Sequence, residues 1–262
     1  MLRITRIEQL HEALQRLKRQ RSGFITSFFS APYQAEQWFE RGVLHGQDWG
    51  DAVLLFRRDR NFYRIYHLAA GSGALKGALE QGSDDPEHST IAADLVGHES
   101  NVTDIAAIYR SVGFHEHLWL MRMSCAVADL RFAASNQVEI QVAAEKDASA
   151  ALDFLSRHLD PLAEQIPPID ELRLAAARGD ILQVRIRNRV VGVLVGEITG
   201  VTAMLRYWFV HPDMHNQGIG SGLIRAFFER VKGCKRIVLW VIASNHDEIG
   251  RASCRERVCL AV

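Results

Sequence analysis

A strand that runs into a glycine-rich loop and then into a helix restricts the fold of this chain most. Residues 203–210 are aromatic and aliphatic and predict a strand, which Pro212 and Asp213 interrupt. Apolar residues then recur at three- and four-residue spacing over 219–231, which is typical of a helix with one buried face. The first turn of such a helix has unpaired amides, and glycines let an anion approach the backbone. The segment therefore predicts a phosphate-binding loop.

The spacing of the glycines decides between the known phosphate loops. A dinucleotide loop needs a third glycine where this chain has Leu223, and no Gly-Lys pair precedes Ser or Thr, as a triphosphate loop requires. The remaining pattern is Gln217-x-x-Gly220-x-Gly222 between a strand and a helix. It resembles the acyl-CoA pyrophosphate loop of the GNAT N-acetyltransferase superfamily, whose pattern is Gln or Arg-x-x-Gly-x-Gly or Ala. A glycine-rich turn without a ligand is the alternative.

This resemblance implies acetyl-CoA as the co-substrate and assigns cofactor-binding residues by position. They are Val210, Gln217, Gly218, Ile219, Gly220, Ser221, Gly222 and, after the strand at 236–242, Asn245. In the family the strands separate near the position of Val210, so its backbone amide is expected to polarise the thioester oxygen during catalysis.

The length of the chain and a second set of similar segments predict two domains. A chain of 262 residues suits two units of about 100 to 150 residues each. Residues 68–73 keep both loop glycines but have Leu68 in place of the polar residue, and residues 108–114 resemble the closing Tyr-x-x-x-Gly-Phe segment of the family. We expect an α/β (α+β) protein of two tandem GNAT-like units, each a mixed, mostly antiparallel sheet flanked by helices.

The first unit is expected at residues 1–135, as a degenerate copy that binds no CoA, and the second at residues 136–249, as the acetyl-CoA-binding domain. For the first half, an unrelated α/β domain is the alternative. Residues 250–262 depart from the family pattern, because Ala252 stands where the usual general acid, a Tyr, should be. We expect a tail that contributes nothing to function and little to the fold, either foreign residues after a truncated gene or true divergence.

The reaction that the resemblance implies is transfer of an acetyl group to a primary amine of a small molecule or peptide. An amine with a pKa of about 10 costs on the order of 4 kcal/mol to deprotonate at neutral pH, so a proton acceptor is needed. Some family members have Glu at the position of Arg206, which cannot accept a proton. Glu197 on the adjacent strand is the candidate base, and an exposed strand carboxylate without a catalytic role is the alternative.

Arg206 and Trp208 are the candidate acceptor-binding residues. Strand alternation places Met204, Arg206, Trp208 and Val210 on one face. The guanidinium could then hold a carboxylate or phosphate while Trp208 packs against an apolar body, which predicts an anionic amine acceptor. A structural ion pair between Arg206 and Glu197 is the alternative.

Two other functions stay open: a catalytically idle CoA-binding regulatory or interaction protein, and an O- or N-acyltransferase for longer acyl chains. Lys plus Arg and Asp plus Glu both number 31, so net charge favours neither nucleic acid nor a membrane as partner. No signal-like start or run of 18 apolar residues is present, and we expect a cytoplasmic monomer or homodimer. No metal is expected, because neither the cysteines nor the histidines have the spacing of metal ligands. These residues are Cys125, Cys234, Cys254 and Cys259 and the histidines at 115, 117, 211 and 215.

Overall fold

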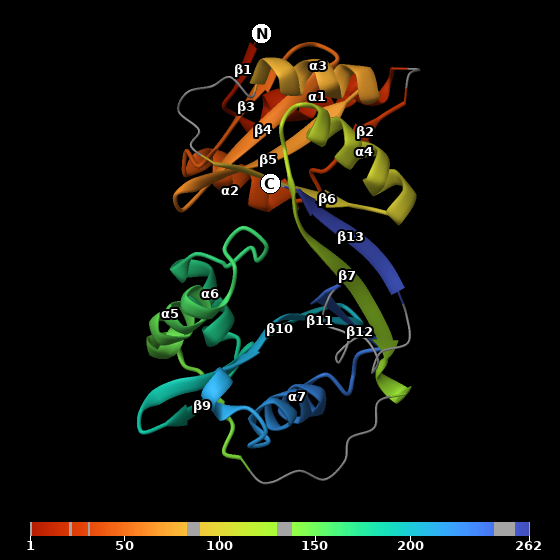
Figure 1. Ribbon diagram of the computed structural model, residues 1–262. Helices are drawn as coiled ribbons and strands as arrows, with labels where there is room; N and C mark the ends of the chain where they lie inside the picture. The colour runs from red at the N-terminus through yellow and green to blue at the C-terminus, as the bar shows by residue number, and fades with distance from the viewer. Residues whose placement is uncertain are drawn as a thin grey trace. The chain divides into compact units, whose positions relative to one another are not determined.

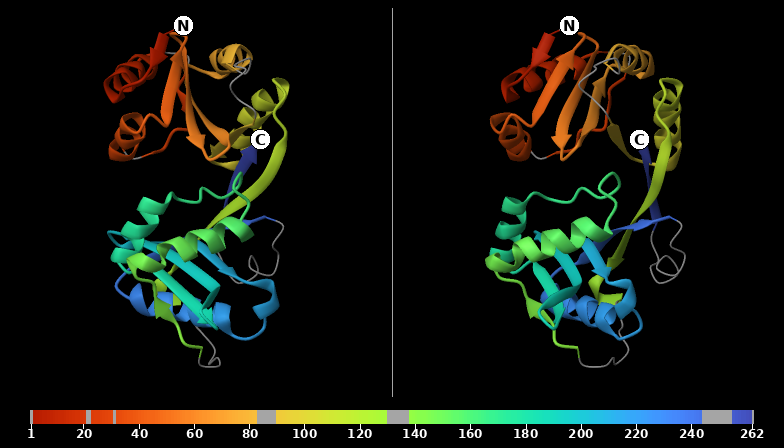
Figure 2. Two further views of the ribbon diagram at one scale, coloured as in Figure 1. Left: turned by 90° about the vertical axis from the view of Figure 1, so that its left-hand side faces the viewer. Right: turned by 60° about the vertical axis from the view of Figure 1, so that its left-hand side comes forward.

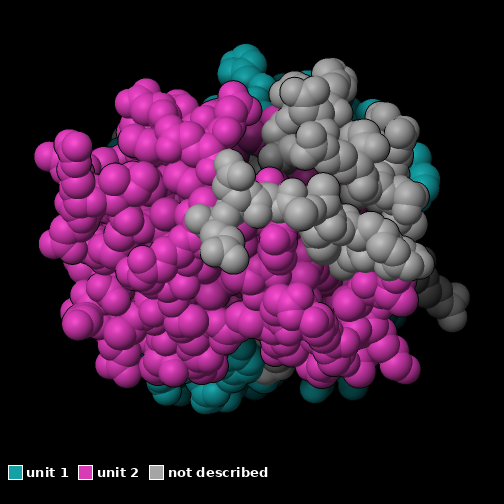
Figure 3. All heavy atoms as spheres, turned by 90° about the horizontal axis from the view of Figure 1, so that it is seen from below, with its two compact units in different colours: residues 1–120, 256–262 teal, residues 121–255 magenta. Residues whose placement is uncertain are grey.

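The computed structural model describes residues 2–20, 23–30, 32–82, 90–129, 138–243 and 255–261. The chain forms two compact units, coloured separately in Figure 3: unit 1 is Met1–Leu120 with Glu256–Val262, and unit 2 is Met121–Arg255. The division at Leu120 differs from the expected boundary at residue 135, because the strand β7 (Glu116–Ala126) contributes residues to both units.

Unit 1 is a sheet with helices on both faces. Its strands are β1 (Leu2–Ile4), β2 (Ile25–Thr26), β3 (Leu44–Asp48), β4 (Ala52–Asp59), β5 (Phe62–Ala69), β6 (Ile91–Val96) and β13 (Arg255–Ala261), and its helices are α1 (Ile7–Lys18), α2 (Pro32–Glu40), α3 (Ser72–Gly82) and α4 (Glu99–Ser111). The strand order is β1-β3-β4-β5-β6-β13-β7, and β2 pairs with β5. Helices α1 and α2 pack on one face and α3 and α4 on the other (Figure 2).

Unit 2 repeats this arrangement (Figure 1). After β7 and the short η1 (Val127–Asp129), its strands are β8 (Gln141–Val142), β9 (Ile181–Ile186), β10 (Arg189–Thr199), β11 (Thr202–Val210) and β12 (Arg236–Ile242). Its helices are α5 (Ala148–His158), α6 (Ile169–Ala177) and α7 (Ile219–Arg230), with single turns at η2 (Glu145–Asp147) and η3 (Pro212–Met214). The order is β7-β12-β11-β10-β9-β8; α5 and α6 pack on one face and α7 on the other.

A β-bulge in β11 changes which residues face α7. Between Gly192↔Val210 and Val195↔Tyr207 the pairing of β10 with β11 is regular, but Gly196 pairs with Leu205, which leaves Arg206 as an extra residue. Ala203 and Leu205 before the bulge lie in the core under α7, and so do Trp208 and Val210 after it, whereas Tyr207 and Phe209 lie in the core under α5 and α6. The expected single face for residues 204, 206, 208 and 210 is therefore wrong, since an inserted residue reverses the alternation.

The tail was expected to contribute little to the fold, but β13 pairs with β6 in antiparallel register, from Val258↔Val96 to Ala261↔Ala93. Main-chain pairing requires an open strand edge but does not require a sustained apolar period. The composition of the tail was therefore a poor predictor of whether it forms a strand. The expectation that the tail has no role in function stays a prediction.

Among the described helices, none combines the length and the apolar character needed to cross a lipid bilayer.

Candidate functional site

The site in unit 2 begins where β11 and β12 separate. The two strands are parallel neighbours only from Thr202↔Arg236 to Leu205↔Leu239, although both continue for several residues beyond. The bulge at Arg206 lies at the point where this pairing stops. The second half of β11 therefore leaves its edge open within the described part of unit 2.

The main chain of Val210 faces this open edge. The amide of His211 donates to the carbonyl of Val191 at 2.8 Å, so Val210, opposite Gly192, occupies a non-hydrogen-bonded position of the antiparallel ladder. Its N–H and C=O therefore point away from β10. The carbonyl accepts a hydrogen bond from Nε2 of His215 at 3.0 Å when that nitrogen carries the proton, which fixes the turn after the strand. The N–H is left as a donor at the open edge.

The first turn of α7 supplies further donors. Asn216 and Gly218 have positive φ values of 62° and 79°, which let the chain turn sharply into the helix. The first bond of the helix runs from the amide of Gly222 to the carbonyl of Gly218 at 2.8 Å, so the amides of residues 219–221 precede the intrahelical ladder. These N–H groups and the positive end of the helix dipole suit an anion such as a pyrophosphate.

The close approach of α7 to β11 explains the glycine at 220. A Cβ on Gly220 would lie 3.3 Å from the ring of Trp208 and 3.6 Å from Val210. The indole Nε1 of Trp208 is buried and has no hydrogen-bond partner among the described residues. An orphaned buried donor beside a helix N-terminus is unfavourable unless a ligand satisfies it, so these residues fit an acyl-CoA. Asn245, the remaining predicted cofactor contact, lies outside the described residues.

Arg206 and Glu197 form an ion pair, which is the alternative that the sequence left open. The guanidinium Nη1 lies 3.3 Å from Oε2 of Glu197, and both side chains are partly exposed. Trp208 faces α7, so Arg206 and Trp208 do not form one acceptor pocket. The catalytic role of Glu197 and the substrate roles of Arg206 and Trp208 are not tested by this geometry.

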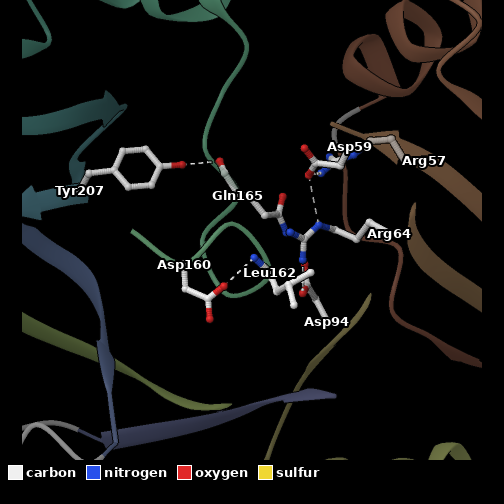
Figure 4. A network of polar contacts seen from close by, with 8 residues as sticks. All are labelled: Arg57, Asp59, Arg64, Asp94, Asp160, Leu162, Gln165 and Tyr207. Atoms are coloured by element: carbon white, nitrogen blue, oxygen red, sulfur yellow. Dashed lines mark hydrogen bonds and ion pairs between the residues drawn. The ribbon is translucent and has the colours of Figure 1, made fainter. Parts of the chain in front are cut away.

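A half-buried carboxyl, that of Glu164, was missed by the sequence analysis. It lies in the connection between α5 and α6, and burial, together with the nearby Asp160, raises its pKa against the opposing effect of Arg206. Tyr207, which follows Arg206 in β11, donates a hydrogen bond to the carbonyl of Gln165, next to Glu164 in the chain (Figure 4). Burial raises the pKa of Tyr207 to about 12. No motif marks Glu164, because its environment depends on contacts between the α5–α6 connection and β11, which are distant in sequence.

The corresponding place in unit 1 is filled by the chain itself. Strand β5 pairs with β6 only from Tyr63↔Ile91 to Ile65↔Ala93, and β4 covers its other edge. Beyond that point β2 pairs with β5, at Ile25↔Ala69 and Thr26↔Leu68. The edge that is open in β11 is therefore occupied in β5.

Buried polar contacts fix this arrangement in unit 1. The amide of His67 donates to Oγ of Ser27 at 3.0 Å, and its Nδ1 lies 2.9 Å from the hydroxyl of Tyr109. Burial lowers the pKa of His67 to about 3, so the imidazole is neutral. Arg64 is fully buried and lies 2.6 Å from Asp94, across β5 and β6 (Figure 4). Unit 1 thus has the two glycines of the loop without an accessible edge beside them.

No group of three or more His, Cys, Asp or Glu side chains suited to a metal ion occurs within the described ranges.

Comparison with known proteins gives a match to a family model only in the second half of the chain. Residues 149–252 match the sequence model of the Acetyltransferase (GNAT) family. A GCN5-related N-acetyltransferase from Sphaerobacter thermophilus has a similar structure, with a TM-score of 0.58, 14% sequence identity and coverage of 89% of this chain and 85% of that chain. An acetyltransferase of the GNAT family from Colwellia psychrerythraea gives 0.54 and 13%, covering 97% and 94%.

The two-unit arrangement also has a counterpart. A tandem GNAT protein from the clavulanic acid biosynthesis pathway aligns with a TM-score of 0.50 and 12% identity over 83% of this chain and 80% of that chain. No curated protein sequence matches the chain significantly. The fold is therefore α+β, built of tandem GNAT-like units.

Proposed function

From the match of residues 149–252 to the model of the Acetyltransferase (GNAT) family, we propose that the chain transfers an acetyl group from acetyl-CoA to a primary amine of a small molecule or peptide. The observation that carries the proposal is the open edge of β11 directly beside the free first turn of α7. The open edge of β11 holds the thioester of acetyl-CoA next to a main-chain donor, and the first turn of α7 holds the pyrophosphate of the same molecule. Gln217 and the residues at 218–222 form the cradle.

The main chain of unit 2 supplies the electrostatic part of the reaction. Attack on a thioester places negative charge on its carbonyl oxygen, and the N–H of Val210 at the open edge is positioned to donate to that oxygen. This donor needs no particular side chain. Glu197 is the base nominated by the sequence, although its carboxylate faces the guanidinium of Arg206.

Amine-dependent release of CoA tests the proposed function. Acetyl-CoA is incubated with the full chain and a panel of primary amines that includes amino acids, polyamines, aminosugars and peptide N-termini, and free thiol is measured. We expect thiol release with at least one amine, together with its N-acetyl product in the mass spectrum. Tight CoA binding without thiol release for any amine would instead show an idle CoA-binding protein.

We further expect that unit 1 binds no CoA, because β2 and Ser27 occupy the edge of β5 that a thioester would need. A photoreactive CoA analogue should label peptides that contain residues 210–222, and an excess of CoA should suppress the labelling. Peptides that contain residues 66–75 serve as the internal control and should stay unlabelled. Equal, CoA-competed labelling of both regions would contradict this prediction.

A further inference from the structure

A cluster of aromatic rings and imidazoles lies on the α5 face of β11, beside Val210. His158, in the last turn of α5, stacks on Phe209 with ring centroids 5.1 Å apart and an interplanar angle of 18°. Its ring also meets Phe154 at 4.8 Å and, edge to face, His211 at 5.1 Å and 83°. Phe209 and His211 are the chain neighbours of Val210. Three ring contacts thus hold the imidazole next to the residue whose N–H faces the open edge.

The ring nitrogens of His158 differ from those of the neighbouring histidines in their contacts. No hydrogen bond to either of them is found in the part of the chain that the structure describes, and the side chain is half-buried. The two neighbouring histidines are engaged differently, because Nδ1 of His211 accepts from the amide of Asp213 at 3.3 Å and Nε2 of His215 contacts the carbonyl of Val210. An imidazole held by stacking alone has both nitrogens available to a substrate.

From this placement we propose that His158 is the general base that deprotonates the acceptor amine in the proposed acyl transfer. The inference rests on the proposed function. The amine nitrogen attacks the thioester carbon, the carbonyl electron pair moves to the oxygen facing the N–H of Val210, and His158 takes the proton that the nitrogen loses. The electron pair on oxygen then re-forms the carbonyl while the C–S bond breaks and its electron pair leaves with sulfur, and the imidazolium returns the proton to give CoA thiol and an amide.

The charge around His158 favours this role. Partial burial, the facing imidazole of His211 and the adjacent guanidinium of Arg157 all lower its pKa, so the ring is neutral at pH 7 and can accept a proton. The carboxylate of Asp213 lies 3.7 Å from Nδ1 of His211. Glu197 differs, because its carboxylate is 3.3 Å from the guanidinium of Arg206.

The test uses the amine that supports the fastest thiol release by the full chain. His158→Phe keeps the stacking but removes the base, and His158→Gln serves as a second variant should the first fold poorly. We expect kcat to fall about 100-fold or more, with the Kd for CoA unchanged within about twofold. Glu164→Gln, which alters a carboxyl on the same face, is the matched control and should lose far less. Activity of both His158 variants near the wild-type level would overturn the proposal.

The pH profile separates a base from a packing residue. Protonation of the acceptor amine lowers kcat/KM in every variant as the pH falls, with a slope of about one in log kcat/KM. In the wild type a second acid limb should steepen this slope to about two as His158 becomes protonated, and the second limb should be absent in His158→Phe. Arg157→Gln removes a cation that lowers the pKa, so its second limb should move to higher pH while activity at the optimum is kept. A second limb that stays in place in both variants would contradict the assignment. Absence of thiol release from the wild type would refute the proposed function instead.

Discussion

Ser221→Pro should weaken CoA binding about 10- to 100-fold while α7 stays folded. Ser221 is exposed, and its amide precedes the first intrahelical bond, from Gly222 to Gly218. Proline is tolerated in the first turn of a helix, because the N–H that it lacks has no intrahelical partner. The substitution therefore removes a single donor to the pyrophosphate. A hydrogen bond to a charged group contributes about 1.5 to 3 kcal/mol, which corresponds to this loss of affinity.

Ser221→Ala is the matched control, since it removes the hydroxyl and keeps the amide. We expect its affinity for CoA to stay within about threefold of the wild type when both are titrated by calorimetry, and the helical circular dichroism of both variants to be unchanged. Equal affinities for Ser221→Pro and Ser221→Ala would mean that the amides of α7 do not hold the ligand. A substitution at Gly220 is less informative, because its Cβ would lie 3.3 Å from the ring of Trp208 and would alter packing as well as the cradle.

Gly196→Ala should destabilise unit 2 by about 1 to 3 kcal/mol, the usual cost of overpacking a core. Gly196 lies in β10 where the register shifts, and a Cβ there would come within 2.1 Å of the ring of Phe227 in α7. Both the strand and the buried ring are constrained, so α7 must move away from the sheet. Because this helix carries the amides of the cradle, CoA affinity should fall together with the thermal midpoint.

Gly233→Ala provides the comparison for that variant. Gly233 is exposed, no atom lies within 4 Å of an added Cβ, and its φ is not positive. Gly to Ala at such a site stabilises by about 0.4 to 1 kcal/mol through the unfolded chain. Thermal unfolding followed by circular dichroism should therefore show opposite shifts for the two variants. An unchanged midpoint for Gly196→Ala would show that α7 and β10 are not packed as described.

Much of unit 2 was predictable because its strong apolar periods coincide with its elements. The strand predicted at 236–242 has those bounds in the structure, the strand predicted at 203–210 is Thr202–Val210, and the helix predicted over 219–231 is Ile219–Arg230. Short strands carry no such signal: β2 covers only Ile25–Thr26, and His45, Gly46 and Gln47 interrupt the apolar pattern of β3. Tertiary pairing decides such short strands, and local pattern does not.

The catalytic surroundings were less predictable because they depend on one inserted residue. The bulge at Arg206 turns Trp208 toward α7 and brings Phe209 to the face where α5 packs. Strict alternation predicts the opposite faces. The contact of His158 follows from the same event, since His158 stacks on Phe209, which strict alternation would place on the α7 face. No sequence motif predicts the bulge at Arg206 or the position of His158.

The number of CoA molecules bound by one chain tests the central claim most directly. The open edge of β11 beside the free amides of α7 predicts a site in unit 2, and β2 fills the matching edge in unit 1. Calorimetric titration of the full chain with CoA should therefore give one site per chain, weakened in Ser221→Pro. Two sites per chain, or no binding at CoA concentrations in the millimolar range, would contradict the account.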